Sequence, residues 1–208
     1  MGISYIKSIS QHASLGLWHI TESWPTLKDM ADLPESALHP LDDKRNDKRK
    51  QEWLACRVLL KEMLPAAALI AYDTNRKPHI EGDKHQISMS HSGDYVSVYI
   101  HDSEPVGVDL QLMKPSISKG SDYFLNALEQ QWVNVDNNLL LHLIWCAKEA
   151  VFKYAGDADL DLKKHIITNP FASNQNGKIQ VSILKENTRN SVMVQFETFN
   201  NYVLAWTI

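Results

Sequence analysis

Apolar residues recur along the chain at two spacings, which divide it into expected strands and helices. Residues 2–21 contain two short apolar stretches, ISYIKSI and LGLWHIT, that predict strands. Residues 41–64 carry apolar side chains at helical spacing and predict a helix. Two extended pieces follow within ISMSHSGDYVSVYI, joined at residues 92–94. The tail adds three strand-like runs, KIQVSILK, SVMVQFETF and YVLAWTI.

The stretch PVGVDLQLMK, residues 105–114, alternates apolar residues with a second set of residues. Successive side chains of a strand point to opposite faces, so the apolar set is expected to face a core. The second set, Gly107, Asp109 and Gln111, then lies together on the other face. The preceding stretch YVSVYI alternates in the same way, and the polar linker HDSEP between the two predicts a hairpin.

Two further helices are expected in the second half of the chain, over residues 121–135 and 139–154. The second of them, LLLHLIWCAKEAVFKY, is apolar on nearly all sides, which predicts deep burial. Each half of the chain therefore contains a helix followed by strands, with a break near residue 102. This organisation predicts two similar lobes, residues 1–102 and 103–208.

The composition is that of an ordinary globular protein, with 44% hydrophobic and 22% charged residues among 208. The net charge is −4, so no global basic excess indicates nucleic acid or an anionic membrane as a partner. The N-terminus does not resemble a signal peptide, and no apolar run approaches the roughly 20 residues needed to cross a bilayer. A cytoplasmic protein is the default expectation, with Cys56 and Cys146 as reduced core thiols.

Charged residues on the apolar helix are the first sign of chemistry. Glu149 and Lys153 are four residues apart and share a helix face. On an exposed helix such a pair is usually solvated. On a buried helix an unpaired carboxylate is costly, so Glu149 needs a partner, which a metal ion or a buried lysine would provide.

Asp109 allows two interpretations. It is either a strand residue that faces solvent, or part of a site that another group approaches closely beside Gly107. One Asp and one Glu from different elements, with the amide oxygen of Gln111, would suit Mg²⁺, which prefers oxygen ligands. The spacing alone does not distinguish these interpretations.

Three segments are candidates for anion binding. Ser90, His91 and the following serine lie at a strand end, where they form either a polar turn or a site for phosphate. Lys77 precedes a proline in a turn-like segment. Arg49 belongs to a run of mixed charges, which is usually a solvated helix face and alternatively a site for a distal phosphate.

Four segments stand in an order that resembles the 4′-phosphopantetheinyl transferases of the longer, two-lobed type: RKPHI, SMSHSGDYVSVYI, VGVDLQ and WCAKEAVFKY. The family patterns Gly-Val/Ile-Asp-Ile-Glu and Trp-x-x-Lys-Glu-Ala/Ser-x-x-Lys correspond to residues 107–111 and 145–153, and a Ser-His-Ser strand end to residues 90–92. Glu129, in YFLNALEQQW, matches a Phe-x-x-x-Glu helix between these patterns, and KRKQEWLACRVLL is similar to the family's N-lobe helix. The likeness covers roughly residues 41–155.

The resemblance implies an α+β fold: a pseudo-dimer of two similar α/β lobes, each with an antiparallel sheet packed against helices. Coenzyme A (CoA) would bind in the cleft between the lobes. The implied reaction moves the 4′-phosphopantetheine arm of CoA onto a serine of an apo acyl or peptidyl carrier protein, and releases adenosine 3′,5′-bisphosphate. Because a pseudo-dimer needs no second chain to complete its cleft, the resemblance implies a monomer.

The resemblance also implies roles for individual residues. Asp109 and Glu149 match positions that bind Mg²⁺, and Glu149, or a water it holds, would take the proton from the incoming serine. Lys153 would stabilise the diphosphate of CoA.

On the nucleotide side of CoA, His91 matches a histidine that binds a CoA phosphate. Ser90 and Lys77 lie at matching positions there. Arg49 belongs to the basic patch of the N-lobe in a looser alignment.

Gln111 departs from the family pattern, because many two-lobed members carry Glu there as a third metal ligand. Its amide oxygen can bind a metal but brings no charge. The alternative to an active transferase is therefore a CoA- or carrier-binding homologue with weakened catalysis. Another Mg²⁺-dependent phosphotransferase is disfavoured, since the sequence has no Gly-x-x-x-x-Gly-Lys-Ser/Thr loop.

Overall fold

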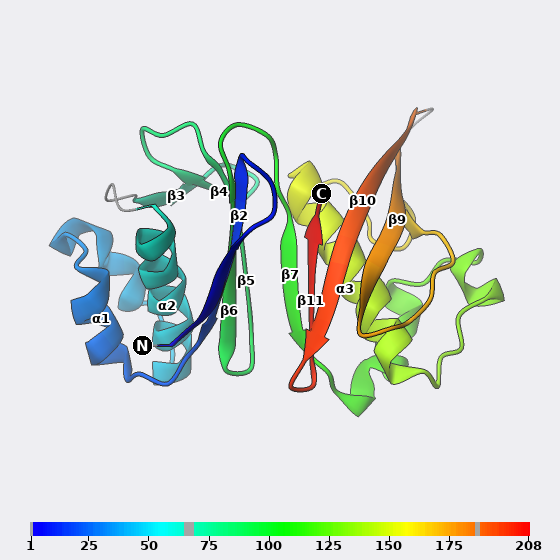
Figure 1. The fold of residues 1–208 in the computed structure, drawn as a ribbon, viewed down its shortest axis with the longest axis horizontal. Coiled ribbons are helices and arrows are strands. Elements are labelled where there is room, and N and C mark those ends of the chain that lie inside the picture. The colour runs from blue at the N-terminus through cyan, green and yellow to red at the C-terminus, as the bar shows by residue number, and fades with distance from the viewer. Residues whose placement is uncertain (1, 65–68, 186–187) are drawn as a thin grey trace. The chain divides into compact units, whose positions relative to one another are not determined.

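The computed structural model describes residues 2–64, 69–185 and 188–208. The chain divides into two compact units, Met1–Glu104 and Pro105–Ile208, with the boundary two residues after the one expected from the sequence. Each unit contains an antiparallel sheet packed against helices, so the predicted α+β class is confirmed (Figure 1). The predicted cleft between two lobes stays a prediction. Over the residues described, no helix is both long and apolar enough to span a membrane.

The first unit is built on a six-stranded sheet of order β1-β2-β6-β5-β4-β3. Its strands are β1 (Ile3–Ser8), β2 (Ala13–His19), β3 (Ile70–Tyr72), β4 (Pro78–Ile80), β5 (Gln86–Ser92) and β6 (Tyr95–His101). Helix α2 (Asp47–Met63) packs on the central strands β2 and β6, and α1 (Trp24–Ala31) packs on α2. β5 and β6 form a tight hairpin at Gly93, which has a positive φ of 55°.

The helices of this unit begin at capping residues. Asn46 accepts a hydrogen bond from the backbone of Arg49 and starts α2, so the helix begins later than the predicted residue 41. The segment before it forms short 3₁₀ helices instead, η1 (Glu35–Ala37) and η2 (His39–Leu41). The sequence-based prediction did not include α1, although Ser23 caps it and a proline lies in its first turn.

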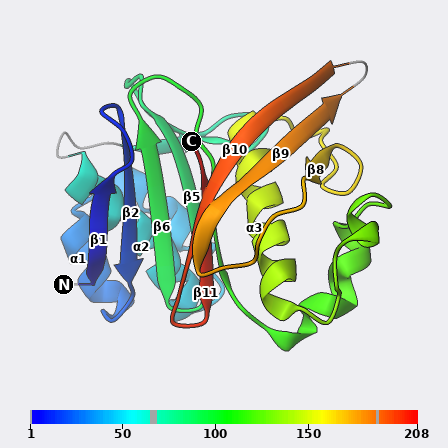
Figure 2. The same cartoon turned by 45° about the vertical axis from the view of Figure 1, so that its right-hand side comes forward.

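The second unit is built on a five-stranded sheet of order β7-β11-β10-β9-β8. Its strands are β7 (Val108–Leu112), β8 (Ile166–Thr168), β9 (Asn176–Lys185), β10 (Thr188–Phe199) and β11 (Tyr202–Thr207). β9 and β10 form the long hairpin seen in Figure 2. Helix α3 (Asn138–Ala155) contacts all five strands, and Gly156 ends it in the left-handed conformation.

The predicted hairpin between YVSVYI and VGVDLQ is wrong. The first stretch is β6, which pairs with β2 and β5, whereas the second is β7, which pairs with β11 in the other sheet. At the start of β7, Gly107 exchanges hydrogen bonds with Thr207 at the end of β11, both at 3.0 Å. Alternation specifies which side chains share a face, but not which strand is the partner.

The predicted helix over residues 121–135 is also wrong. The segment contains two 3₁₀ helices, η3 (Pro115–Tyr123) and η4 (Glu129–Gln131), separated by turns. Asn126 accepts hydrogen bonds from the backbone of Leu128 and Glu129, and the Glu129 carboxylate accepts one from the backbone of Asn126. These side chains satisfy backbone groups that a continuous α-helix would use.

Candidate functional site

β7 directs Asp109 toward helix α3. Asp109 pairs with Ala205 and Gln111 pairs with Val203, so all four side chains share one face of the sheet. On that face, Val203 and Ala205 belong to the same apolar cluster as residues of α3. Asp109 is only 6% exposed, which excludes the interpretation of a strand residue facing solvent.

Gly107 brings the start of β7 into direct contact with the backbone of α3. A Cβ atom at this position would lie 1.8 Å from the carbonyl oxygen of Ala150 and 2.8 Å from the backbone nitrogen of Tyr154. The sequence predicted a close approach beside Gly107, and the group that approaches is a helix backbone. Ala150 follows Glu149 directly, so this contact lies in the turn of α3 that carries the candidate carboxylate.

Lys153 holds the Asp109 carboxylate in place. Its ammonium group donates to Asp109 Oδ1 at 2.7 Å and to the carbonyl oxygen of Val108 at 3.0 Å. The Lys153 side chain keeps 27% exposure, whereas that of Asp109 keeps 8%. One face of the pair is therefore accessible to a ligand.

Glu149 is half-buried beside the same two groups. The pKa of Glu149 is raised to about 7: burial makes the largest contribution, the nearby Asp109 carboxylate adds to the rise, and Lys153 opposes it. These effects place Glu149, Asp109 and Lys153 in one electrostatic cluster. The structure thus brings together the three residues that the sequence predicted as the catalytic group.

Cys146 lies beneath this cluster. It is fully buried on α3, and burial raises the pKa of its thiol well above the ordinary value. The Asp109 carboxylate raises that pKa further, partly through a hydrogen bond with the thiol. Cys146 is therefore a protonated core thiol in contact with the site.

The donor atoms available here fit Mg²⁺. Asp109 and Glu149 supply carboxylate oxygens from two elements, and Gln111 adds an amide oxygen on the same face of β7 as Asp109. Among the residues described, no group of three or more His, Cys, Asp or Glu side chains forms a metal cluster. A set of two carboxylates suits Mg²⁺, which usually keeps several waters and binds substrate phosphates.

The first unit contains a second polar cluster, at the N-terminal end of α2 and the end of β5. Arg49 Nη1 lies 2.8 Å from His91 Nε2 and 2.9 Å from Glu52 Oε2. His91 Nε2 lies 3.2 Å from the same Glu52 oxygen. Arg49 and His91, which were each predicted to bind CoA, therefore lie in contact. The sequence-based prediction did not include Glu52, although its position three residues after Arg49 places the two on one helix face.

Two further residues predicted to bind CoA, Ser90 and Lys77, belong to the same unit. Ser90 is buried on β5, next to His91. Lys77 lies in the turn before β4, where its backbone donates to Asp73. Burial lowers the pKa of the Lys77 side chain, and Asp73 opposes that effect.

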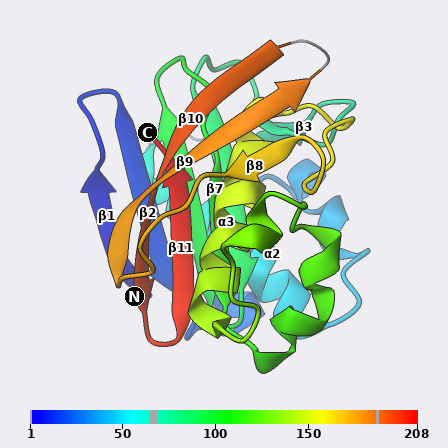
Figure 3. The same cartoon turned by 90° about the vertical axis from the view of Figure 1, so that its right-hand side faces the viewer.

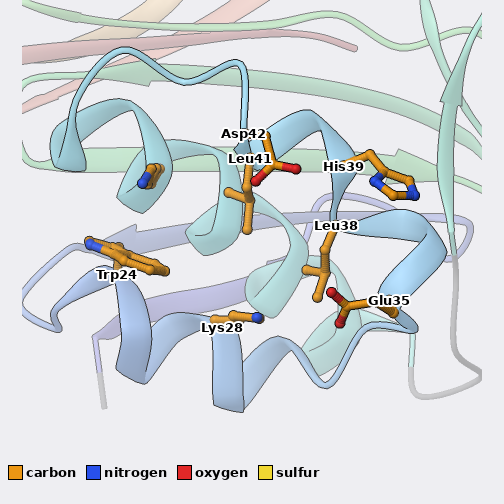
Figure 4. Close-up of a pocket in the computed structure, with 8 residues that line it drawn as sticks. Trp24, Lys28, Glu35, Leu38, His39, Leu41 and Asp42 are labelled. Atoms are coloured by element: carbon orange, nitrogen blue, oxygen red, sulfur yellow. The ribbon is translucent and has the colours of Figure 1, made fainter.

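A separate hollow of about 130 Å³ lies between α1, α2 and the 3₁₀ helices of the first unit (Figure 4). Two of the residues that line this hollow contact each other: Lys50 Nζ lies 4.5 Å from the centre of the Trp24 ring. The hollow is lined by Trp24, Lys28, Glu35, Leu38, His39, Leu41, Asp42 and Lys50. None of the predicted site residues lines it, so it adds nothing to the assignment of the site.

Comparison with known proteins finds one family, and its model matches the second unit. Residues 105–207 match the family model of the 4′-phosphopantetheinyl transferase superfamily. A 4′-phosphopantetheinyl transferase AcpT of Escherichia coli (strain K12) is 30% identical over 117 residues, which cover 52% of this chain and 59% of that protein. The AcpT of Salmonella typhi is 29% identical over 115 residues, covering 52% and 60%. The chain thus matches about three fifths of the length of these curated relatives.

Proposed function

Because the chain belongs to the 4′-phosphopantetheinyl transferase superfamily through residues 105–207, we propose that it transfers 4′-phosphopantetheine from CoA to a serine of an apo carrier protein. The products are a holo acyl or peptidyl carrier protein and adenosine 3′,5′-bisphosphate. The observation that carries the proposal is the cluster of Asp109, Glu149 and Lys153. It forms where Gly107, having no side chain, allows β7 to approach the backbone of α3 closely. CoA and the carrier are the partners, and a single chain is the functional unit.

In this proposal Glu149 acts as the general base. The serine hydroxyl oxygen of the carrier attacks the phosphorus atom that bears the pantetheine arm. The bond from that phosphorus to the bridging oxygen breaks, and adenosine 3′,5′-bisphosphate departs with the bond's electrons. Glu149 accepts the serine proton, directly or through a water that it holds.

Lys153 and Asp109 position the diphosphate. The Lys153 ammonium donates two hydrogen bonds within the protein and has a third N–H for a phosphate oxygen. Asp109 and Glu149, with the amide oxygen of Gln111, would hold Mg²⁺. When bound, this ion would neutralise negative charge on the diphosphate.

The cluster of Arg49 and His91 supports the nucleotide side of the proposal. Guanidinium and imidazole groups are donors that suit phosphate oxygens. We propose that these two side chains, with Ser90 and Lys77, bind the phosphorylated nucleotide of CoA. Glu52 keeps Arg49 in place at 2.9 Å.

Mass spectrometry tests the proposed function directly. The protein is mixed with CoA, Mg²⁺ and a panel of apo carrier proteins, and each carrier is weighed before and after. One carrier is expected to gain the mass of a phosphopantetheine group. If CoA binds but no carrier gains mass, the protein is a binding homologue and the proposed transfer is contradicted.

The stability of the metal-free protein should fall as the pH rises from about 4.5 to 7. In this window the folded protein keeps a proton on Glu149, whose pKa is about 7, while the unfolded chain, with a pKa of 4.5, has released it. Mg²⁺ binds the ionised carboxylate, so the stabilisation that it provides should grow over the same window. Urea unfolding at pH 5 and pH 8, with and without Mg²⁺, measures both effects. The proposed environment of Glu149 would be contradicted if the stability of the wild type did not change with pH and if Glu149→Gln had the same stability profile.

Gln111→Glu should strengthen the binding of Mg²⁺. The added carboxylate lies two residues from Asp109 on the same face of β7, so the metal gains a charged ligand. The Mg²⁺ concentration for half-maximal rate is expected to fall by roughly 3- to 10-fold, as one added charge contributes about 1 kcal/mol near a partly exposed site. An unchanged Mg²⁺ dependence would show that position 111 does not touch the metal.

A further inference from the structure

The second unit contains a buried ion pair that the proposed reaction does not use. Lys148 and Glu129 are both 0% exposed, and Lys148 Nζ lies 2.7 Å from Glu129 Oε2. Burial lowers the pKa of Lys148, and the Glu129 carboxylate acts against that effect. Removing two charges from water is expensive, so such a pair is retained only with further hydrogen bonds.

Every hydrogen-bonding position of the Lys148 ammonium is occupied. Besides Glu129, it donates to the carbonyl oxygens of Phe124 at 2.5 Å and Leu162 at 3.0 Å. An ammonium group has three N–H donors and no acceptor. Lys148 therefore has no donor left for a phosphate, although it stands directly before Glu149 in the matched motif.

Both oxygens of the Glu129 carboxylate likewise accept hydrogen bonds. Its Oε1 accepts from the backbone and hydroxyl of Thr168 at 2.8 and 2.7 Å, and its Oε2 accepts from Lys148 and from the backbone of Asn126. The pair thus connects α3, β8, the segment 115–134 and the chain after α3. Figure 3 shows this segment beside α3, on the side away from β11.

The turn of α3 that carries Glu149 is held from two directions. Gly107, directly before β7, contacts the backbone of Ala150 on one side, and the Lys148–Glu129 pair connects the helix to the segment 115–134 on another. The segment consists of short 3₁₀ helices and turns, and three of its apolar residues, Phe124, Leu125 and Val133, also pack in one buried cluster with residues of α3. The rotation and position of Glu149 relative to Asp109 therefore depend on both contacts.

We propose that Lys148 and Glu129 are positioning residues, which fix the turn of α3 that presents Glu149 to Asp109 and the substrate. The inference rests on the proposed function and adds to it two residues that touch neither CoA nor metal. A misplacement of about 1 Å costs roughly 100-fold in rate at such sites, so loosening this turn should affect catalysis beyond its effect on stability.

Three variants test the inference: Lys148→Met, Glu129→Gln and the double variant. Each single change leaves a buried group without its partner and should lower stability. At temperatures where the proteins are folded, kcat is expected to fall at least about tenfold, and the apparent Mg²⁺ affinity, followed by thermal shift, should weaken by roughly the same factor. The double variant should recover part of the stability, because no lone charge is left, but not kcat.

The matched control is Ile179→Ala, on β9. Ile179 is fully buried in the same apolar cluster as α3, and its truncation lowers stability without touching the pair. Its kcat and Mg²⁺ affinity should stay within about twofold of the wild-type values at matched folded fraction. The inference would be overturned if the double variant recovered kcat, or if the control lost as much kcat and Mg²⁺ affinity as the variants of the pair. Either result would leave the pair with a role in stability alone.

The wild-type protein separates this test from that of the proposed function. Transfer by the wild type, with variants that keep normal kcat and Mg²⁺ affinity, would overturn the positioning role and leave the function standing. A wild-type protein that neither transfers phosphopantetheine nor binds Mg²⁺ would overturn both.

Discussion

Replacing Glu149 with glutamine should lower the rate of phosphopantetheine transfer by at least about 10³-fold, since a general base alone contributes roughly 10²–10⁴-fold. The change removes the proton acceptor and one of the two carboxylates that would hold Mg²⁺. The amide has nearly the same shape, so the packing of the half-buried side chain is conserved. Single-turnover assays with saturating CoA and carrier measure the chemical step.

The fold of the Glu149→Gln variant should be intact, and at pH 8 without Mg²⁺ it should be more stable than the wild type. At that pH the wild type carries an ionised carboxylate that burial disfavours, with a pKa of about 7. The amide avoids this cost, so the free energy of unfolding should rise by roughly 1–3 kcal/mol after allowance for the partial exposure of the side chain. Lost activity with raised stability is a result that misfolding does not produce.

Glu62→Gln is the matched control for this substitution. Glu62 is an exposed residue of α2, and the chemical change is the same. Its rate should stay within about twofold of the wild-type rate, as for surface substitutions in general. If Glu149→Gln retained more than a tenth of the wild-type rate, neither the base nor the ligand role would hold.

The sequence predicted which candidate residues share a face better than it predicted the elements that surround them. Glu149 and Lys153 share a face because α3 is a regular helix, and Asp109 and Gln111 share a face because β7 is a regular strand. Both relations follow from local periodicity. The contact that joins the two elements, Lys153 to Asp109 at 2.7 Å, joins residues 44 positions apart. Only the family motifs indicated that Asp109 and the helix face of Glu149 and Lys153 belong to one site.

The failed predictions share a physical cause. β7 was expected to pair with β6, its neighbour in sequence, but it pairs with β11 at the end of the chain. The segment 121–135 was expected to be a helix, but the Glu129 carboxylate bonds to Thr168 and Lys148 from other elements. Tertiary hydrogen bonds decided both outcomes, and a window of neighbouring residues does not contain them.

Gly107→Ala should lower the free energy of unfolding by at least about 3 kcal/mol, at the upper end of the range for overpacking. The new methyl group would lie 1.8 Å from the carbonyl oxygen of Ala150 and 2.8 Å from the backbone nitrogen of Tyr154. These atoms belong to the backbone of a buried helix, so no flexible side chain can move aside. β7 and α3 must separate, and urea unfolding measures the cost.

Gly120→Ala is the matched control for this change. Its Cβ would meet only the Tyr123 ring, at 3.9 Å, which is ordinary van der Waals contact. The free energy of unfolding should change by less than about 0.5 kcal/mol. Equal losses in both variants would show that the clash with the backbone of α3 is not the cause of the lost stability.

Separating β7 from α3 in Gly107→Ala should also affect the candidate site more than a loss of stability alone would. Asp109 is two residues from Gly107, and Glu149 directly precedes Ala150, so moving β7 away from α3 moves the two carboxylates apart. The binding of Mg²⁺ should therefore weaken in Gly107→Ala even at low temperature, where the protein is folded. Adding Ala150→Gly should not restore it, because the clash is with the backbone oxygen of residue 150 and the new glycine weakens the helix by about 1 kcal/mol. Rescue by that second change would mean that a side-chain contact, and not the approach of two backbones, sets the distance between Asp109 and Glu149.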